Sequence, residues 1–248
     1  MNRPSSHYIV PDWPAPVSVK AAITTRLGGV SSGAFGSFNL AEHVGDKADS
    51  VLQNRRKLML DWQLARSPLW LTQVHGTRVV DASSSIQAVE ADGSFAFGAA
   101  PACVVMTADC LPVLLCDRAG ERVAALHAGW RGLATGIVEK GVASMQRPGS
   151  EILAYLGPAI GPQKFEVGGE VRAEFCKVLP QAEEAFNPLP GDKWLADIYR
   201  LAQQRLAACG VEAIYGGGRC TVEESKIFYS YRRDGDSGRM ASLIWIDG

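Results

Sequence analysis

An apolar stretch between residues 103 and 128 most constrains the fold of this chain. It contains three strand-like runs, CVVMT, PVLLCD and RVAALH, and a short polar segment separates the last two. Short apolar runs bounded by turn residues are typical of β-strands. If the last two runs pair across the segment from Arg118 to Glu121, Asp117 faces Arg122. The constant register then places Pro112 opposite His127.

This register predicts that Cys110 and His127 approach each other. Cys110 has the same strand parity as Pro112, so both side chains point to one face of the hairpin as diagonal neighbours, about 7–8 Å apart at Cα. That spacing suits a shared metal ion, and it equally suits a thiolate and an imidazole paired as nucleophile and base. The other five cysteines lie in apolar or helical contexts, where cysteine behaves as a small hydrophobic residue.

A metal ion would need a third ligand, and the chain has only four histidines. His7 lies in the proline-rich start and His43 in a glycine-rich region, whereas His75 ends a strand-like segment as His127 does. His75, Cys110 and His127 would form a Cys-His₂ set with one vacant position, as expected of a catalytic zinc site. Spacing alone leaves open that the three residues never meet.

The rest of the chain mixes strands and helices without strict βαβ alternation, which predicts an α+β fold with mixed sheets. Strands are expected at 17–25, 151–157 and 211–215, and helices at 51–62, 131–145, 169–179 and 194–209. Asp49 or Ser50 is expected to cap the first helix. A closing hairpin is expected around DGDSG (234–238). Its charged residues should neutralise one another, namely Arg232, Arg233, Asp234, Asp236 and Arg239.

Composition excludes several classes of protein. The 248 residues are 47% hydrophobic and 21% charged, which is ordinary for a globular enzyme of one large domain or two joined ones. A net charge of -1 gives no electrostatic footprint for nucleic acid. Prolines interrupt the N-terminal segment where a signal peptide needs an apolar core, and no run reaches transmembrane length. The six cysteines show no disulfide framework, so the protein is predicted to be cytoplasmic and not membrane-bound.

Many short sequence segments also resemble those of the YfiH-type laccase-domain family, to which human FAMIN is related. They occur in the same order and over almost the whole chain. They include TTRLGGVSSGAFGSFNL, TQVHG, TADCLPVLLCD, HAGWRGL, LGPAIGP and SYRRDG. The resemblance implies a single domain over 1–248 with a layered mixed α/β fold, distantly similar to a toxin deamidase. It also implies metal ligands matching His75, Cys110 and His127.

The resemblance implies a purine nucleoside phosphorylase with adenosine deaminase and methylthioadenosine phosphorylase activity. Zinc would explain deamination, because it lowers the pKa of bound water to about 7. Phosphorolysis needs an anion site, which the loop from Arg26 to Gly29 could provide together with Arg55 or Arg131. Arg55 could equally be a solvated helix residue, and Arg131 could equally neutralise the charge of Asp109. Asp109 could accept from a ligand histidine, carry a proton or close a turn.

Three other functions stay open from sequence. A copper polyphenol oxidase is one, since a His₂Cys set can hold copper in place of zinc; four histidines cannot also supply a trinuclear cluster. Peptidoglycan editing is another, in which misincorporated L-serine is removed from a UDP-muramoyl peptide by an activated water or by the Cys110 thiolate. The third is a non-enzymatic metal-binding protein, which would enclose the ion in four protein ligands.

Overall fold

A computed structural model describes residues 7–85 and 87–247 of the chain. The N-terminal segment is predicted to contain no signal peptide, and its residues 1–6 lie outside the described residues. In the described ranges no helix is both long and apolar enough to cross a bilayer. The α-helices are α1 (Ala48–Asp61), α2 (Trp130–Thr135), α3 (Ile137–Ser144), α4 (Gly169–Val178), α5 (Ile198–Ala208) and α6 (Tyr231–Asp234). Short 3-10 helices are η1 (Gly33–Phe35), η2 (Gly149–Glu151) and η3 (Pro180–Ala185).

The strands form three sheets. A four-stranded antiparallel sheet has the order β1 (Tyr8–Ile9), β2 (Val19–Thr24), β13 (Met240–Ile246) and β5 (Cys103–Thr107). A six-stranded sheet has the order β12 (Ala213–Gly216), β8 (Ile152–Leu156), β6 (Leu111–Asp117), β7 (Arg122–Ala128), β4 (Gly93–Phe97) and β3 (Val79–Asp81). Its outermost pairs are parallel and its inner pairs antiparallel. A small antiparallel sheet joins β10 (Phe186–Leu189), β11 (Lys193–Ala196) and β9 (Glu166–Gly168). The predicted α+β class with mixed sheets is confirmed.

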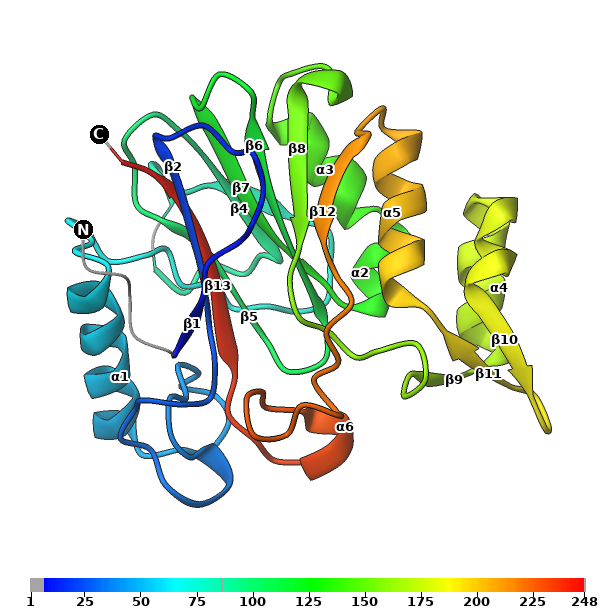
Figure 1. Cartoon of the computed structure of the whole chain (residues 1–248), viewed down its shortest axis with the longest axis horizontal. Helices are drawn as coiled ribbons and strands as arrows, with labels where there is room; N and C mark the ends of the chain where they lie inside the picture. The colour runs from blue at the N-terminus through cyan, green and yellow to red at the C-terminus, as the bar shows by residue number, and fades with distance from the viewer. Residues whose placement is uncertain (1–6, 86, 248) are drawn as a thin grey trace.

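The two larger sheets pack face to face between two layers of helix (Figure 1). Val105 and Ile244 of the four-stranded sheet meet Leu114 and Val123 of the six-stranded sheet in one buried cluster. Helix α1 covers the outer face of the four-stranded sheet through Leu58. Helices α2, α3 and α5 cover the outer face of the six-stranded sheet. The order of layers is therefore helix, sheet, sheet, helix.

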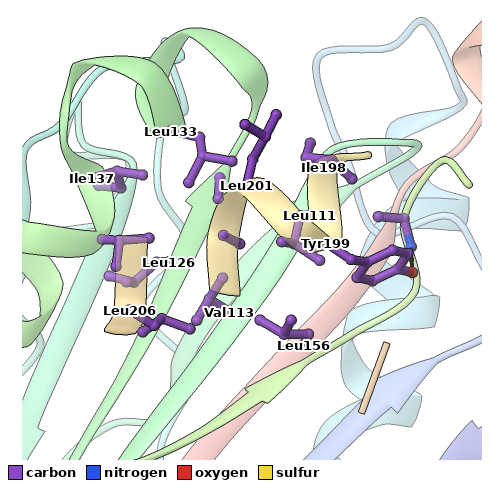
Figure 2. Close-up of a cluster of buried hydrophobic side chains, with 14 of the residues drawn as sticks. Leu111, Val113, Leu126, Leu133, Ile137, Leu156, Ile198, Tyr199, Leu201 and Leu206 are labelled. Atoms are coloured by element: carbon purple, nitrogen blue, oxygen red, sulfur yellow. Dashed lines mark hydrogen bonds between the residues drawn. The ribbon is translucent and has the colours of Figure 1, made fainter. Parts of the chain in front are cut away.

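Strands β6 and β7 are buried on both faces, which explains why the sequence reveals them so clearly. Along β7, Val123 and Ala125 point toward the other sheet, whereas Leu126 packs beneath the helices. Figure 2 shows this helix-side cluster, in which Leu126 lies close to the helical side chains Ile137 and Leu206. A strand covered on both faces reads as a nearly continuous apolar run rather than as an alternation.

The predicted register of the β6–β7 hairpin is confirmed. Pro112 pairs with His127 and Cys116 with Val123. The Asp117 carboxylate accepts hydrogen bonds from the backbone N–H groups of residues 121 and 122, at 2.8 and 3.0 Å, and so closes the polar turn.

Two predicted helices are wrong in their extent. The helix predicted at 131–145 is two helices, because Gly136 adopts φ 109° and ends α2 before α3 begins. The helix predicted at 194–209 starts at Ile198, since the Asp197 side chain accepts from two N–H groups of the first turn. The preceding residues form β11 instead. The first helix also begins earlier than predicted. Its N-cap is Lys47, and Asp49 and Ser50 lie within its first turn.

The predicted closing hairpin is wrong. Residues 231–234 form α6, whose N-cap Ser230 accepts from the Arg233 N–H, and β13 pairs with β2 and β5 rather than with its own preceding segment. Charge neutralisation holds for Arg233, which bonds Asp234 at 2.7 Å. Arg239 instead lines a cavity described below. The antiparallel partners available in the sheet outweigh the local turn signal.

Four strand ends meet at one edge of this sandwich. Strand β5 ends and β13 begins there, as the pair of Thr107 with Met240 shows. Strand β6 begins and β7 ends there, as the pair of Leu111 with Ala128 shows. The residues that join these strands at 108–110, 129 and 239 are therefore gathered at one place, and the candidate site lies among them.

Candidate active site

The structure brings the three predicted ligands together. His75, Cys110 and His127 each offer one ligand atom, and these atoms all lie within 4.8 Å of one another. The Cys110 Sγ is 3.8 Å from the Nε2 of His75. Zinc bonds of about 2.3 Å to sulfur and about 2.0 Å to nitrogen place a sulfur and a nitrogen ligand about 3.5 Å apart in a tetrahedral site. The donor set therefore fits a zinc-sized ion, and thiolate and imidazole donors also suit copper.

A bend before β6 places Cys110. Asp109 adopts φ 90°, a left-handed conformation, immediately ahead of the ligand. Its carboxylate accepts from the Thr221 hydroxyl and from the backbone N–H of Arg232, each at 2.6 Å. Its carbonyl accepts from the N–H of Ile160 at 2.9 Å. Of the roles considered for Asp109, these contacts correspond to the turn; a role toward substrate stays a prediction.

Asp92, which the sequence analysis missed, connects the two histidine ligands. It is fully buried just before β4, and its carboxylate is 2.8 Å from the Nδ1 of His127. The same carboxylate accepts from the backbone N–H groups of His75 at 2.8 Å and Gly76 at 2.6 Å. An ionised carboxylate can only accept, so we assign the His127 proton to Nδ1, which leaves Nε2 as the ligand atom. The sequence signal was faint: one acidic residue beside a glycine at the start of a strand.

The charges of the site reinforce one another. Burial raises the pKa of Cys110, but the charge of His127 and hydrogen bonds from both histidines outweigh it and lower the pKa to about 6. Burial lowers the pKa of His127, whereas the Cys110 thiolate and Asp92 raise it to about 9. By contrast, burial raises the pKa of Cys103 and Cys116 to about 12. Cys110 thus has the thiolate character of a ligand or nucleophile, and the two others are buried thiols.

Gly129 leaves room for the ligands. A Cβ added at this position would lie 2.8 Å from the Cδ2 of His75 and 3.1 Å from the Cys110 Sγ. Such a contact is too short for packed carbon and sulfur atoms, so only glycine fits between β7 and α2 with the ligands in place. This requirement gives a physical reason for the glycine in the HAGWRG segment.

Two cavities adjoin the candidate site. The first, of about 350 Å³, is lined by all three together with His43, Gln73, Met106, Thr107, Ala108, Tyr231 and Arg239. The second, of about 250 Å³, is lined by Asp109, Trp130, Arg131, Ile160, Phe165, Ile198 and Arg232. Ala108, Cys110 and Tyr231 belong to the walls of both. Cys110 therefore stands where the two cavities meet.

The predicted substrate arginines are in three different places. Arg26 donates to two backbone carbonyls and lies over the ring of Tyr229. Arg55 donates to the Leu40 carbonyl and to Glu42. Neither side chain is in the wall of either cavity, whereas Arg131 is in the wall of the second. Their roles toward substrate stay predictions.

Two further cavity residues were missed by sequence reasoning. Gln73 donates to and accepts from the backbone of Met106, at 2.8 and 2.7 Å, and thereby fixes the His75 segment to the end of β5. Arg239 was assigned to a neutralised cluster, although it directly precedes an apolar strand. Polar residues at strand ends are positioned by a rigid scaffold and often carry function. The position of Arg239 directly before an apolar strand was therefore the sequence signal that could have identified it as a site residue.

Known proteins with this sequence and fold give the site a family context. Residues 20–247 match the family described as multi-copper polyphenol oxidoreductase laccase. A purine nucleoside phosphorylase of Pseudomonas aeruginosa is 53% identical over 241 residues, which cover 96% of this chain and 98% of that protein. The purine nucleoside phosphorylase YfiH of Escherichia coli is 52% identical over 242 residues, 97% of this chain and 99% of its own.

The same likeness holds in three dimensions. The crystal structure of the Neisseria meningitidis protein NMB0706 superposes with a TM-score of 0.95 at 51% identity, covering 98% of this chain and 100% of that one. The resemblance noted in the sequence words is thus supported by sequence and by fold. The chain belongs to the YfiH-type laccase-domain family, the family described as multi-copper polyphenol oxidoreductase laccase.

Proposed function

We propose that this chain is a zinc-dependent purine nucleoside phosphorylase that also deaminates adenosine. Its substrates would be inosine, adenosine, guanosine or methylthioadenosine together with phosphate. The observation that carries the proposal is the meeting of His75, Cys110 and His127 at the wall of an accessible cavity. Relatives at about half identity over nearly their whole length are named purine nucleoside phosphorylases, which supports the choice of substrate.

The chain's own residues prepare the site for this chemistry. Zinc, when bound, supplies a Lewis acid that can polarise a substrate atom or lower the pKa of water. Asp92 holds the His127 ring through Nδ1 and the His75 backbone through its N–H, so both imidazoles are oriented before substrate arrives. Cys110 contributes a thiolate at neutral pH because its pKa is lowered to about 6.

The cavity favours an enzyme over a metal-storage protein. His75 is exposed and Cys110 half-buried, so a small molecule can reach the ligands from the first cavity. A closed structural site would instead surround the ion with four protein ligands. The four histidines of the chain also argue against a laccase, since three of them would serve one ion or line its cavity. Copper remains an alternative occupant of the Cys-His₂ set.

We further propose that residues 1–248 act as one domain and that the enzyme works in the cytoplasm. The cytoplasm keeps thiols reduced, and a ligand thiolate such as Cys110 must stay reduced to bind metal. The six cysteines are all free thiols in the structure.

The test is metal analysis of protein purified without added metal, followed by turnover of inosine with phosphate. We expect about one zinc per chain and phosphate-dependent release of hypoxanthine. Cys110→Ala and His127→Ala should lose zinc and turnover, by more than the roughly 10–100-fold that loss of a hydrogen-bond partner of a metal ligand costs, while keeping the far-UV circular dichroism of the parent. Cys176→Ala, a half-buried helical cysteine away from the site, is the matched control and should behave as the parent.

Two arms of the same test separate the alternatives. Adenosine deamination should not require phosphate, and chelation of the metal should abolish it; equal deamination by metal-free protein would contradict the role of zinc. Full phosphorolysis by Cys110→Ala would show that the assigned site is not the active site. Hydrolysis of UDP-muramoyl-serine without any phosphorolysis of inosine would favour peptidoglycan editing instead.

A further inference from the structure

The first cavity carries an unpaired cation. Within residues 7–85 and 87–247, no carboxylate forms an ion pair with Arg239, although the charges of Asp109 and Asp236 reach it. Its guanidinium donates through Nη1 to the carbonyls of Ser237 and Gly238, at 2.7 and 3.1 Å. Nε and Nη2 have no protein acceptor in the described part of the chain, so this edge of the guanidinium can receive a ligand.

Arg239 supplies the positive charge of this cavity. His43 lines it together with Arg239. Burial lowers the pKa of His43, and the charges of Arg239 and Arg55 lower it further, so this imidazole is uncharged at neutral pH. Arg55 is itself paired with Glu42, so Arg239 is the free cation of the three. A half-buried arginine with an open edge binds phosphate in bidentate geometry.

The second cavity has a different character. Trp130 and Phe165 line it with the aliphatic residues Ile160 and Ile198. Arg131 lies over the Trp130 ring at 4.3 Å, and Arg232 lies over the Phe165 ring at 5.8 Å. Aromatic faces and guanidinium planes stack on flat heteroaromatic rings. Two aromatic rings and two guanidinium planes therefore suit this cavity to a flat heteroaromatic ring such as a purine.

We infer that the two cavities divide the substrates: Arg239 binds phosphate in the first, and the purine occupies the second beside Trp130. This inference rests on the proposed function and gives its substrates an orientation. The ribose then lies at the shared wall of Cys110 and Tyr231. There an oxygen of hydrogen phosphate bonds to C1′ while the C1′–N9 bond breaks. The bonding pair of C1′–N9 passes to the purine, and the proton that hydrogen phosphate loses ends on the released base.

Steady-state kinetics with each substrate varied in turn tests this division. Arg239→Gln should raise the KM for phosphate at least 10-fold and change the KM for inosine less than twofold, with Arg239→Lys intermediate. Trp130→Ala should raise the KM for inosine at least 10-fold and leave the KM for phosphate unchanged. Trp130→Phe should bring the KM for inosine part of the way back to the parent value. Arg118→Gln is the control, because Arg118 donates to the Ser150 carbonyl at the far turn of the β6–β7 hairpin. All variants should retain the parent's zinc content.

Calorimetric titration with inorganic phosphate keeps this inference separate from the proposed function. Parent protein should bind phosphate, and Arg239→Gln should bind at least 10-fold more weakly. That result would support the phosphate subsite even if inosine were not a substrate. Equal binding by parent and variant, no binding by the parent, or a rise in the inosine KM alone in Arg239→Gln would overturn it.

Discussion

At the scale of single residues, Asp92 does more for the candidate site than its position in the sequence suggests. One carboxylate fixes the ring of His127 and the backbone of His75, two ligands that are 52 residues apart in the chain. Burial raises the pKa of Asp92, but hydrogen bonds from His127 and Gly76 outweigh burial and lower it. The group therefore stays ionised at neutral pH and acts only as an acceptor.

Replacing Asp92 with asparagine should weaken metal binding while preserving the fold. Asparagine keeps the shape but loses the charge that orients both histidines, and loss of such a partner costs about 10–100-fold in metal affinity. Competition with a zinc-chelating dye measures this change. Asp81→Asn is the control, since Asp81 accepts from Ser83 in a turn after β3. Unchanged zinc affinity in Asp92→Asn would reduce Asp92 to a structural residue of the loop.

At the scale of elements, close packing of α3 on β7 depends on a glycine. A Cβ at Gly141 would lie 2.3 Å from the Cδ1 of Leu126, which is fully buried, so a shift of Leu126 would disturb the neighbours packed around it. The same strand carries His127 at its end, so the position of α3 and the position of a ligand are set by one strand. Helix propensity favours alanine over glycine by about 1 kcal/mol, and packing opposes it here.

Gly141→Ala should therefore destabilise the protein. Overpacking costs about 1–3 kcal/mol and should exceed the gain of about 1 kcal/mol in propensity. Leu126→Ala alone should cost about 2–5 kcal/mol, and the double variant should cost less than the sum of the two. Urea unfolding measures these values. Ala143→Gly, on the exposed side of α3, is the control for propensity alone. A stabilising Gly141→Ala would contradict the packing argument.

At the scale of the whole molecule, the last strand completes both the core and the site. Strand β13 lies between β2 and β5, and its Ala241, Leu243 and Ile244 are fully buried. Arg239 directly precedes it and lines the first cavity. Strand β13 thus joins the N-terminal strand β2 to β5 (Figure 1). The segment that leads to Cys110 follows the end of β5.

A truncation that removes residues 240–248 should abolish cooperative folding, because it exposes the facing edges of β2 and β5 and part of the core between the sheets. We expect loss of the near-UV circular dichroism signal and of a sharp thermal transition. A shorter truncation, of residues 247–248, should retain both, since β13 ends at Ile246. A parent-like transition in the longer truncation would show that β13 is dispensable.

The sequence by itself determined the elements whose signals are local. It also determined the family resemblance, because the segments that carry it are continuous in the chain. The doubly buried strands β6 and β7 read as apolar runs, their polar turn set the register, and the register brought Cys110 toward His127. Helix α4 also lies close to its predicted range. The arginines Arg26 and Arg55 were offered for the anion site that phosphorolysis needs; they lie outside the walls of both cavities, and their roles stay predictions.

Only the tertiary structure decided what depends on contacts between distant segments. Residues 194–196 belong to the helix predicted at 194–209, yet strands on both sides pair with them as part of β11. The closing segment formed no hairpin, because β2 and β5 offered two antiparallel partners to β13. Asp92 and Arg239 show no motif of their own. Asp92 directly precedes β4 and Arg239 directly precedes β13, and the packing of these strands places both residues beside the candidate ligands. Local propensity is worth a fraction of a kcal/mol per residue, so burial between layers overrides it.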